Sequence, residues 1–236
     1  MTVRHERRGH VVSVTIDRPE TRNAVDLATL RSLEEIMSDL GDARVLVLSG
    51  APPAFCSGAD LTGVELGEFT DTLQRVLASF GAAPLITLAA VDGPALGAGS
   101  QLAAACDLRM ATPESRFGVP AAKLGLAVDR WTVDRLVSEA GASVARRMLL
   151  TGESSTAAEL LGGFVHRLGT VDEALEWASS LAGLAPLTVV AHKLALEGVV
   201  DADVMEAARL AAWASRDADE GRRAFKEKRP PNFLGH

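Results

Sequence analysis

Two nearly continuous apolar runs, at residues 45–48 and 85–91, constrain the fold of this chain more than any other feature. A strand with one solvent-exposed face alternates apolar and polar residues. A strand covered on both faces is apolar throughout, which is typical of parallel sheets with helices on both sides. Residues 69–80, between the two runs, follow a helical pattern. Further strands are predicted at 11–17 and 108–111, and a further helix at 26–40. The alternation predicts an α/β fold with parallel strand pairing.

The pattern changes after Pro186, where only helical periodicity follows, at 187–199, 204–213 and 217–228. We therefore predict an α/β core over residues 1–185 and a helical C-terminal region over residues 186–236. Two capping boxes, Thr156 with Glu159 and Thr170 with Glu173, predict further helix starts inside the core.

The composition excludes several classes of function. The net charge is −7, and a general nucleic-acid or membrane-surface binder needs a basic field instead. No apolar run reaches the roughly 20 residues of a membrane span, and the polar N-terminus fits no secretory signal, so we expect a cytoplasmic protein. The two cysteines and five histidines show no metal-ligand spacing, so we expect no metal.

A glycine-rich turn at 92–102 is the first segment that could carry chemistry, because a strand there runs into Gly97-Ala98-Gly99 and then into a helix. Small residues let a ligand approach the backbone, and free N–H groups at a helix start favour negative charge. A dinucleotide loop is excluded because Leu102 stands where the third glycine belongs. A tight packing turn stays open as the alternative.

The segment 55–61 has the same character, since a strand ends there in a glycine turn. Cys56 could be a nucleophile, but a small residue at a strand end is the favoured interpretation, because no base is indicated nearby. Ser57 does not belong to a Gly-x-Ser-x-Gly elbow, so a hydrolase triad is unsupported.

Taken together, the chain resembles the crotonase (enoyl-CoA hydratase/isomerase) superfamily. The matching segments, in order along almost the whole chain, are 18–24, 55–61, 92–111, 117–120, 123–126 and 227–233. The resemblance implies a spiral of ββα repeats, with a C-terminal helical region that forms a homotrimer or a dimer of trimers. It also implies a fatty acyl-CoA thioester as ligand, with no covalently bound cofactor, and a role in lipid metabolism.

The resemblance also assigns site residues. Two backbone N–H groups, those of Ala59 and Ala98, correspond to the oxyanion hole that holds the thioester carbonyl. Such donors are worth roughly 3–4 kcal/mol each when charge develops on the oxygen. The remaining assigned residues correspond to coenzyme A contacts, the last two reaching the ligand of a neighbouring subunit: Asn23, Ala24, Ser57, Gly58, Asp60, Leu61, Phe225 and Lys228.

The chain departs from the hydratase pattern at both catalytic glutamates, which are replaced by Gln101 and Ala121. Hydration needs one carboxylate to take a proton from water and another to give a proton to the α-carbon. An amide does not titrate and an alanine has nothing to transfer. We therefore predict an acyl-CoA carrier or sensor without hydratase activity, one that delivers its ligand to a partner protein of lipid synthesis. The small residue at 121 leaves room for a long acyl chain.

Asp129 supports the alternative, an active isomerase, hydrolase or weak hydratase. It aligns with the nucleophilic aspartate of dehalogenase-type members, and a carboxylate near a thioester can act as nucleophile or base. The tryptophan that those members also carry falls at Ala121 here. Because Arg130 follows Asp129, an ion pair or a loop cap would explain the aspartate equally well.

Overall fold

The computed structural model describes residues 2–60, 62, 66–198 and 201–236. Among these, six strands form the larger sheet, in the order β1-β2-β3-β4-β6-β9, and three form a smaller sheet, in the order β5-β7-β8. Only β1–β2 in the larger sheet and β7–β8 in the smaller sheet pair antiparallel. The strands are β1 (Val3–Arg8), β2 (Val11–Ile16), β3 (Val45–Gly50), β4 (Ile86–Val91), β5 (Pro94–Leu96), β6 (Leu108–Ala111), β7 (Arg116–Gly118), β8 (Ser154–Thr156) and β9 (Arg167–Leu168).

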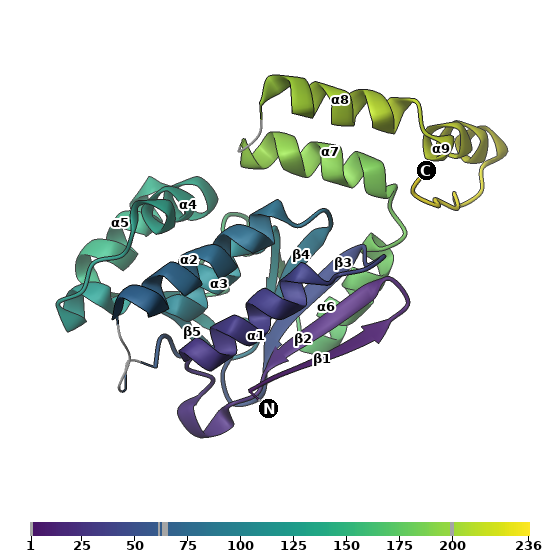
Figure 1. Cartoon of the computed structure of the whole chain (residues 1–236). Helices are drawn as coiled ribbons and strands as arrows, with labels where there is room; N and C mark the ends of the chain where they lie inside the picture. Colours follow the sequence, from purple (N-terminus) through teal and green to yellow (C-terminus); the bar gives the residue numbers. More distant parts are fainter. Residues whose placement is uncertain (1, 61, 63–65, 199–200) are drawn as a thin grey trace.

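Helices cover both faces of the larger sheet, which accounts for its apolar strands (Figure 1). In β3, Leu46 and Leu48 point into the core cluster that includes Leu30 and Leu77 of the helices on one face. Val47, which points the other way, packs in the cluster of the opposite helix. The helices on the first face are α1 (Leu27–Ser38), α2 (Leu66–Ala82) and α3 (Ala98–Ala105), and α6 (Val171–Leu181) covers the second. The predicted α/β fold with parallel pairing is confirmed.

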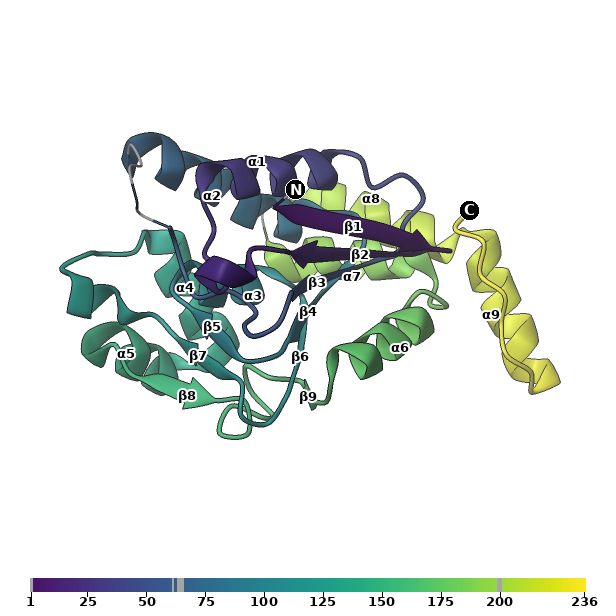
Figure 2. The same cartoon turned by 90° about the horizontal axis from the view of Figure 1, so that it is seen from below.

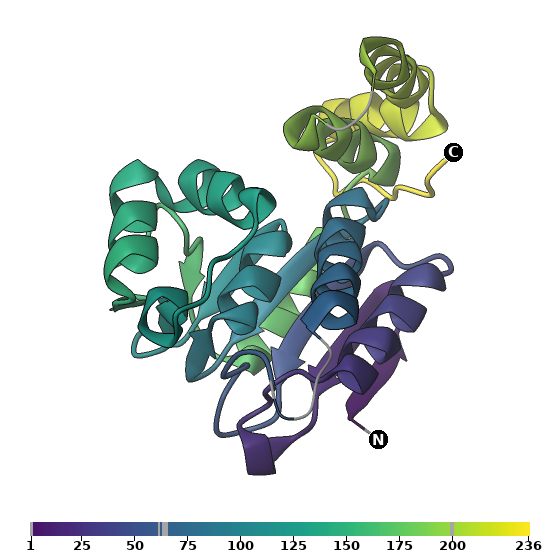
Figure 3. The same cartoon turned by 60° about the vertical axis from the view of Figure 1, so that its left-hand side comes forward.

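The remaining helices lie to either side of this core (Figures 1 and 3). The short 3₁₀ helices are η1 (Pro19–Thr21) and η2 (Pro120–Leu124), and the others are α4 (Arg130–Ala140), α5 (Ala142–Thr151), α7 (Pro186–Glu197), α8 (Ala202–Trp213) and α9 (Arg216–Glu227). The predicted helical C-terminal region is present. It is anchored by the buried Lys193, whose Nζ donates to Asp107 Oδ2 at 2.8 Å and to the carbonyls of Phe80 and Leu85 at 2.7 and 2.9 Å.

One of the two capping-box predictions is wrong. Thr170 and Glu173 bond reciprocally and start α6 as expected. Thr156 and Glu159 make the same reciprocal bonds, at 2.8 and 3.3 Å, but no helix follows, because Thr156 ends β8 and the next residues form a turn. The hydrogen-bond pattern of a capping box therefore closes a turn here.

No single helix in the described part of the chain is both long and apolar enough to cross a membrane. By length and composition alone, α6 and α7 would qualify only as a pair, and they are bent by 110° relative to each other.

Candidate functional site

The two glycine-rich turns of the sequence lie against each other. Cys56 and Ala95 form a parallel bridge, in which the Cys56 N–H donates to Pro94 O at 3.0 Å and Leu96 N–H donates to Cys56 O at 2.9 Å. A Cβ atom on Gly99 would lie only 2.2 Å from Cys56 O, so glycine is required where α3 begins against this bridge. The turn before α3 also depends on Gly97, whose φ of +52° belongs to the left-handed region.

The N–H groups of Ala59 and Ala98 are both left without a protein acceptor within the described residues. Val25 bridges Ala59 in parallel by donating to Gly58 O at 2.9 Å and accepting from Asp60 N–H at 2.8 Å. In such a bridge the central residue's own N–H faces away from the partner strand. Ala98 is the first residue of α3, and a first-turn N–H has no acceptor inside its helix.

Ala59 and Ala98 line one cavity of about 320 Å³, which we call the glycine-turn cavity. Asp129 is the only ionisable side chain among the described residues that line it. The lining residues are Ser57, Gly58, Ala59, Phe69, Thr70, Leu73, Gln74, Leu77, Gly97, Ala98, Gln101, Val119, Pro120, Ala121, Leu124, Leu126, Ala127, Val128 and Asp129. A mostly apolar cavity with two free backbone donors suits a polar carbonyl carried on an apolar group.

Gln101 and Ala121, the two positions at which the sequence resemblance places the hydratase glutamates, both line this cavity. Gln101 is 8% exposed, and its Nε2 donates to Thr132 Oγ1 at 2.6 Å. Ala121 lies on η2 and is partly buried. Neither side chain can transfer a proton to or from a ligand.

Asp129 is the N-cap of α4. Its Oδ1 accepts from Thr132 N–H at 2.9 Å, and its Oδ2 accepts from Gln74 Nε2 at 3.0 Å. The loop-cap interpretation therefore describes its geometry, while catalysis by Asp129 stays a prediction. Gln74 and Thr132 were not predicted. Gln74 is an exposed polar residue on an amphipathic helix, and Thr132 lies in the first turn of α4, so neither has a local signal that marks a site.

Three predicted coenzyme A residues use their polar groups inside the protein. The buried side chain of Asn23 accepts from Arg18 N–H at 2.8 Å and donates to the carbonyls of Ala51 and Ala54, both at 2.6 Å. The Ala24 carbonyl accepts from the Arg18 guanidinium. The Ser57 hydroxyl donates to a backbone carbonyl of η1 at 3.0 Å. Of these three residues, only Ser57 lines the glycine-turn cavity.

Asp60 lies just outside the cavity lining. Its pKa is held below the ordinary value by hydrogen bonds from Thr62 and then from Arg18, whose Nη2 lies 3.2 Å from Asp60 Oδ2. Gly58 lines the cavity beside Ala59, and Leu61 lies outside the described residues.

Phe225 and Lys228 lie far from the glycine-turn cavity within one chain. Phe225 is 88% exposed on α9, and Lys228 is the left-handed C-cap of the same helix. Figure 2 shows α9 extending away from the sheets, at the opposite end of the molecule from α4 and α5. A contact between these residues and a ligand in the cavity therefore requires a second copy of the chain.

Cys56 packs as a small buried residue. Burial raises the pKa of its thiol to about 12, and Sγ lies 3.6 Å from Gly58 O. A thiol with so high a pKa is a poor nucleophile at neutral pH. In the described part of the chain, no three His, Cys, Asp or Glu side chains cluster as a metal site would require.

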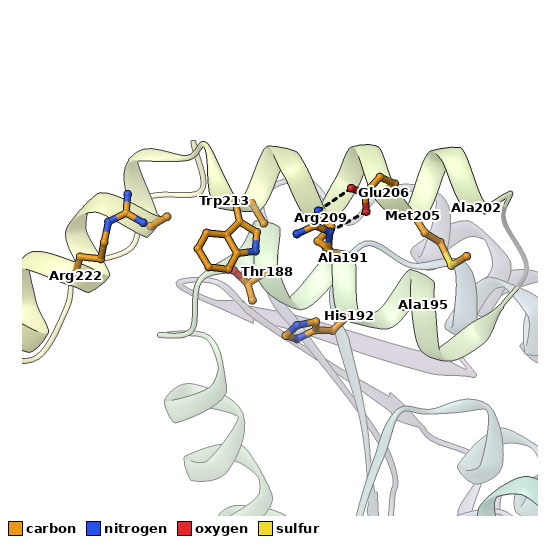
Figure 4. Close-up of a pocket in the computed structure, with 12 residues that line it drawn as sticks. Thr188, Ala191, His192, Ala195, Ala202, Met205, Glu206, Arg209, Trp213 and Arg222 are labelled. Atoms are coloured by element: carbon orange, nitrogen blue, oxygen red, sulfur yellow. Dashed lines mark hydrogen bonds and ion pairs between the residues drawn. The ribbon is translucent and has the colours of Figure 1, made fainter.

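A larger cavity, of about 650 Å³, lies among α7, α8 and α9 (Figure 4). Trp213, His192 and Met205 line it, and Arg209 is held by Glu206 at 2.6 Å. Neither of the two glycine turns lines this larger cavity, and the residues that carry the free N–H groups, Ala59 and Ala98, do not line it. We therefore place the candidate site in the smaller, glycine-turn cavity, where the chemistry converges.

Comparison with known proteins identifies the family of the chain. A family model described as enoyl-CoA hydratase/isomerase matches residues 6–236. The chain belongs to the enoyl-CoA hydratase/isomerase family. Within this family it is 40% identical to "Probable enoyl-CoA hydratase echA6" of Mycobacterium tuberculosis, over 95% of this chain and 96% of that protein. It is 35% identical to the 2,3-dehydroadipyl-CoA hydratase of Escherichia coli, over 97% of each chain.

Solved structures of the family share the fold. The enoyl-CoA hydratase of Bacillus anthracis superposes with a TM-score of 0.89 at 28% identity, over 100% of both chains. The enoyl-CoA hydratase/carnitine racemase of Magnetospirillum magneticum gives 0.88 at 28% identity, over 100% of this chain and 96% of that one. The crotonase fold that the sequence resemblance implied is confirmed.

Proposed function

We propose that this family member binds a fatty acyl-CoA thioester, with its carbonyl oxygen between the Ala59 and Ala98 N–H groups, and does not hydrate it. One observation carries the proposal. Both free donors line the same cavity as Gln101 and Ala121, so the cavity has the means to hold a carbonyl but lacks the pair of carboxylates that hydration needs. The donors are backbone groups, so substitutions at 101 and 121 leave them in place.

The expected loss of hydration is large. A general acid–base group contributes about 10²–10⁴ in rate, so the absence of this pair should remove at least that factor. Asp129 is a single carboxylate, whereas hydration by this family pattern uses two. Its two oxygens are also engaged by Thr132 and Gln74.

A binding protein of this kind would act as an acyl-CoA carrier or sensor in cytoplasmic fatty acid metabolism, with a partner protein of lipid synthesis receiving the acyl group. It would assemble as a homotrimer or a dimer of trimers through the region 186–236. Phe225 and Lys228 would then reach the coenzyme A of a neighbouring subunit. Support comes from the apolar side chains that this region exposes, Leu196, Leu210, Trp213 and Phe225.

The experiment pairs catalysis with binding. Crotonyl-CoA hydration is followed spectrophotometrically, and butyryl-CoA binding is measured by calorimetry on the same preparation. We expect binding without turnover in the native protein. The double variant Gln101→Glu/Ala121→Glu should gain hydration, and each single variant, which restores one carboxylate only, is its matched control. Robust native turnover that survives Gln101→Ala would contradict the proposal.

The second candidate function rests on Asp129 as the ionisable side chain on the cavity. A panel of acyl-CoA substrates tests it. Isomerase or hydrolase turnover that is abolished in Asp129→Asn, which keeps the helix cap but loses the charge, would establish the alternative. If the native protein turns over no member of the panel, the alternative is excluded.

A further inference from the structure

A second apolar cavity adjoins the glycine-turn cavity. It has a volume of about 580 Å³ and lies between η2 and the helices α4 and α5; we call it the α4–α5 groove. Four residues line both spaces: Ala121, Leu126, Ala127 and Val128. The chain segment 121–128, which we call the dividing segment, therefore borders both cavities.

The dividing segment is a thin wall. Two of its N–H groups, those of Gly125 and Leu126, donate to the same acceptor, Ala121 O, and thereby close the end of η2. Ala127 and Val128 make no backbone–backbone hydrogen bond with any described residue. Residues with small side chains and no backbone hydrogen bonds, as at Ala127 and Val128, cost little to displace.

The α4–α5 groove is apolar and open to solvent. Arg146 is the only charged side chain among the described residues that line it. Leu150 is 71% exposed and Val137 is 42% exposed there. The other residues of the groove beyond the shared four are Ala122, Val133, Ala142, Ala145 and Leu149. A concave, mostly apolar lining of this kind suits an apolar ligand.

We propose that the α4–α5 groove is the distal site for the chain of a long-chain acyl thioester. The chain passes the dividing segment beside Ala121 and lies between η2, α4 and α5. The groove's apolar lining and its contact with the carbonyl-holding cavity through four shared residues favour this occupant. A short acyl group ends inside the first cavity, and a long one fills both. This inference rests on the proposed function and names the ligand class of the same site.

Calorimetry with butyryl-, octanoyl- and palmitoyl-CoA tests the inference, with palmitoyl-CoA kept below its self-association concentration. Two variants alter the groove alone: Leu150→Gln replaces an exposed apolar side chain, and Ala142→Trp fills space. Their matched controls, Leu161→Gln and Ala158→Trp, change exposed residues that line neither cavity. We expect both groove variants to weaken palmitoyl-CoA binding by about fivefold or more and to leave butyryl-CoA within about twofold. The controls should leave both affinities unchanged.

Several results would overturn the inference, and they can be told apart. Native protein that binds butyryl-CoA but gains no affinity with chain length refutes the distal site and leaves the proposed function standing. If native protein and both groove variants bind palmitoyl-CoA with equal affinity, the distal site is likewise refuted and the proposed function stands. If Leu150→Gln instead changes the mass measured by native mass spectrometry, with no chain-length effect, the groove is a contact between copies of this chain. Failure of every acyl-CoA to bind refutes the proposed function itself.

Discussion

The variant Ala98→Pro tests the carbonyl-holding role with little disturbance of the fold. Proline removes the N–H of the first residue of α3, a group that has no acceptor inside the helix, and proline is well tolerated at this position. The preceding Gly97 has ψ of −118°, outside the helical range that a following proline disfavours. The free energy of unfolding should therefore change by less than about 1 kcal/mol.

The cost should appear in ligand binding instead. A neutral hydrogen bond contributes about 1 kcal/mol net, so butyryl-CoA affinity should fall about fivefold, while coenzyme A, which has no thioester carbonyl, should bind unchanged. Ala98→Val is the matched control, because it adds bulk to the same cavity wall and keeps the N–H. Calorimetry gives the affinities, and infrared spectra of ¹³C-labelled thioester report the carbonyl.

The carbonyl stretch should move toward its free value in Ala98→Pro only. A folded Ala98→Pro protein with the butyryl-CoA affinity and carbonyl frequency of Ala98→Val would refute the assignment of the Ala98 N–H.

Three further predictions concern stability and reactivity. Gly99→Ala should lower the free energy of unfolding, measured by urea denaturation, by about 2–3 kcal/mol, because the new Cβ would lie 2.2 Å from Cys56 O. The control Gly67→Ala, where the new Cβ meets open space, should leave the free energy of unfolding unchanged. Lys193→Met should lower the free energy of unfolding by about 3 kcal/mol in the same assay, because the Asp107 carboxylate and two backbone carbonyls would lose the buried ammonium group that they bind. Burial raises the pKa of both cysteine thiols to about 12, so iodoacetamide at pH 8 should label Cys56 and Cys106 only in urea; fast labelling of native protein would contradict that burial.

The parts of the fold that could be predicted are those with a local signature. Burial on both faces leaves an apolar run, which located β3 and β4, and helical periodicity located α1, α2 and the helices after Pro186. The strand β1 has no such signature, because five of its six residues are exposed at the edge of the sheet. β5, β7, β8 and β9, each of two or three residues, are too short to show a period.

The candidate site divides in the same way. The glycines at 97 and 99 are visible in the sequence for two different reasons. The φ of +52° favours glycine at position 97, and the close approach of Cys56 O excludes a Cβ atom at position 99. The bonds that hold the polar side chains of the cavity, from Gln101 to Thr132 and from Gln74 to Asp129, join residues 31 and 55 positions apart. Contacts over such separations leave no periodicity or spacing in the sequence, so only the fold reveals them.

The geometry is also compatible with our proposal that the carbonyl-holding groups are present while the proton-transferring groups are absent. The two donors that we propose hold the carbonyl are backbone groups, fixed by the bridge from Val25 to Ala59 and by the start of α3 against Cys56. A side-chain substitution at 101 or 121 touches neither support. The proton-transferring groups, by contrast, are side chains, and each is lost in a single substitution. In our proposal, the alanine at 121, which lines both cavities, leaves room for an acyl chain to pass toward the α4–α5 groove. Alanine in place of glutamate at 121 would then both remove a hydration group and favour a long acyl chain. One substitution would thus turn an enzyme of this fold toward a binding protein.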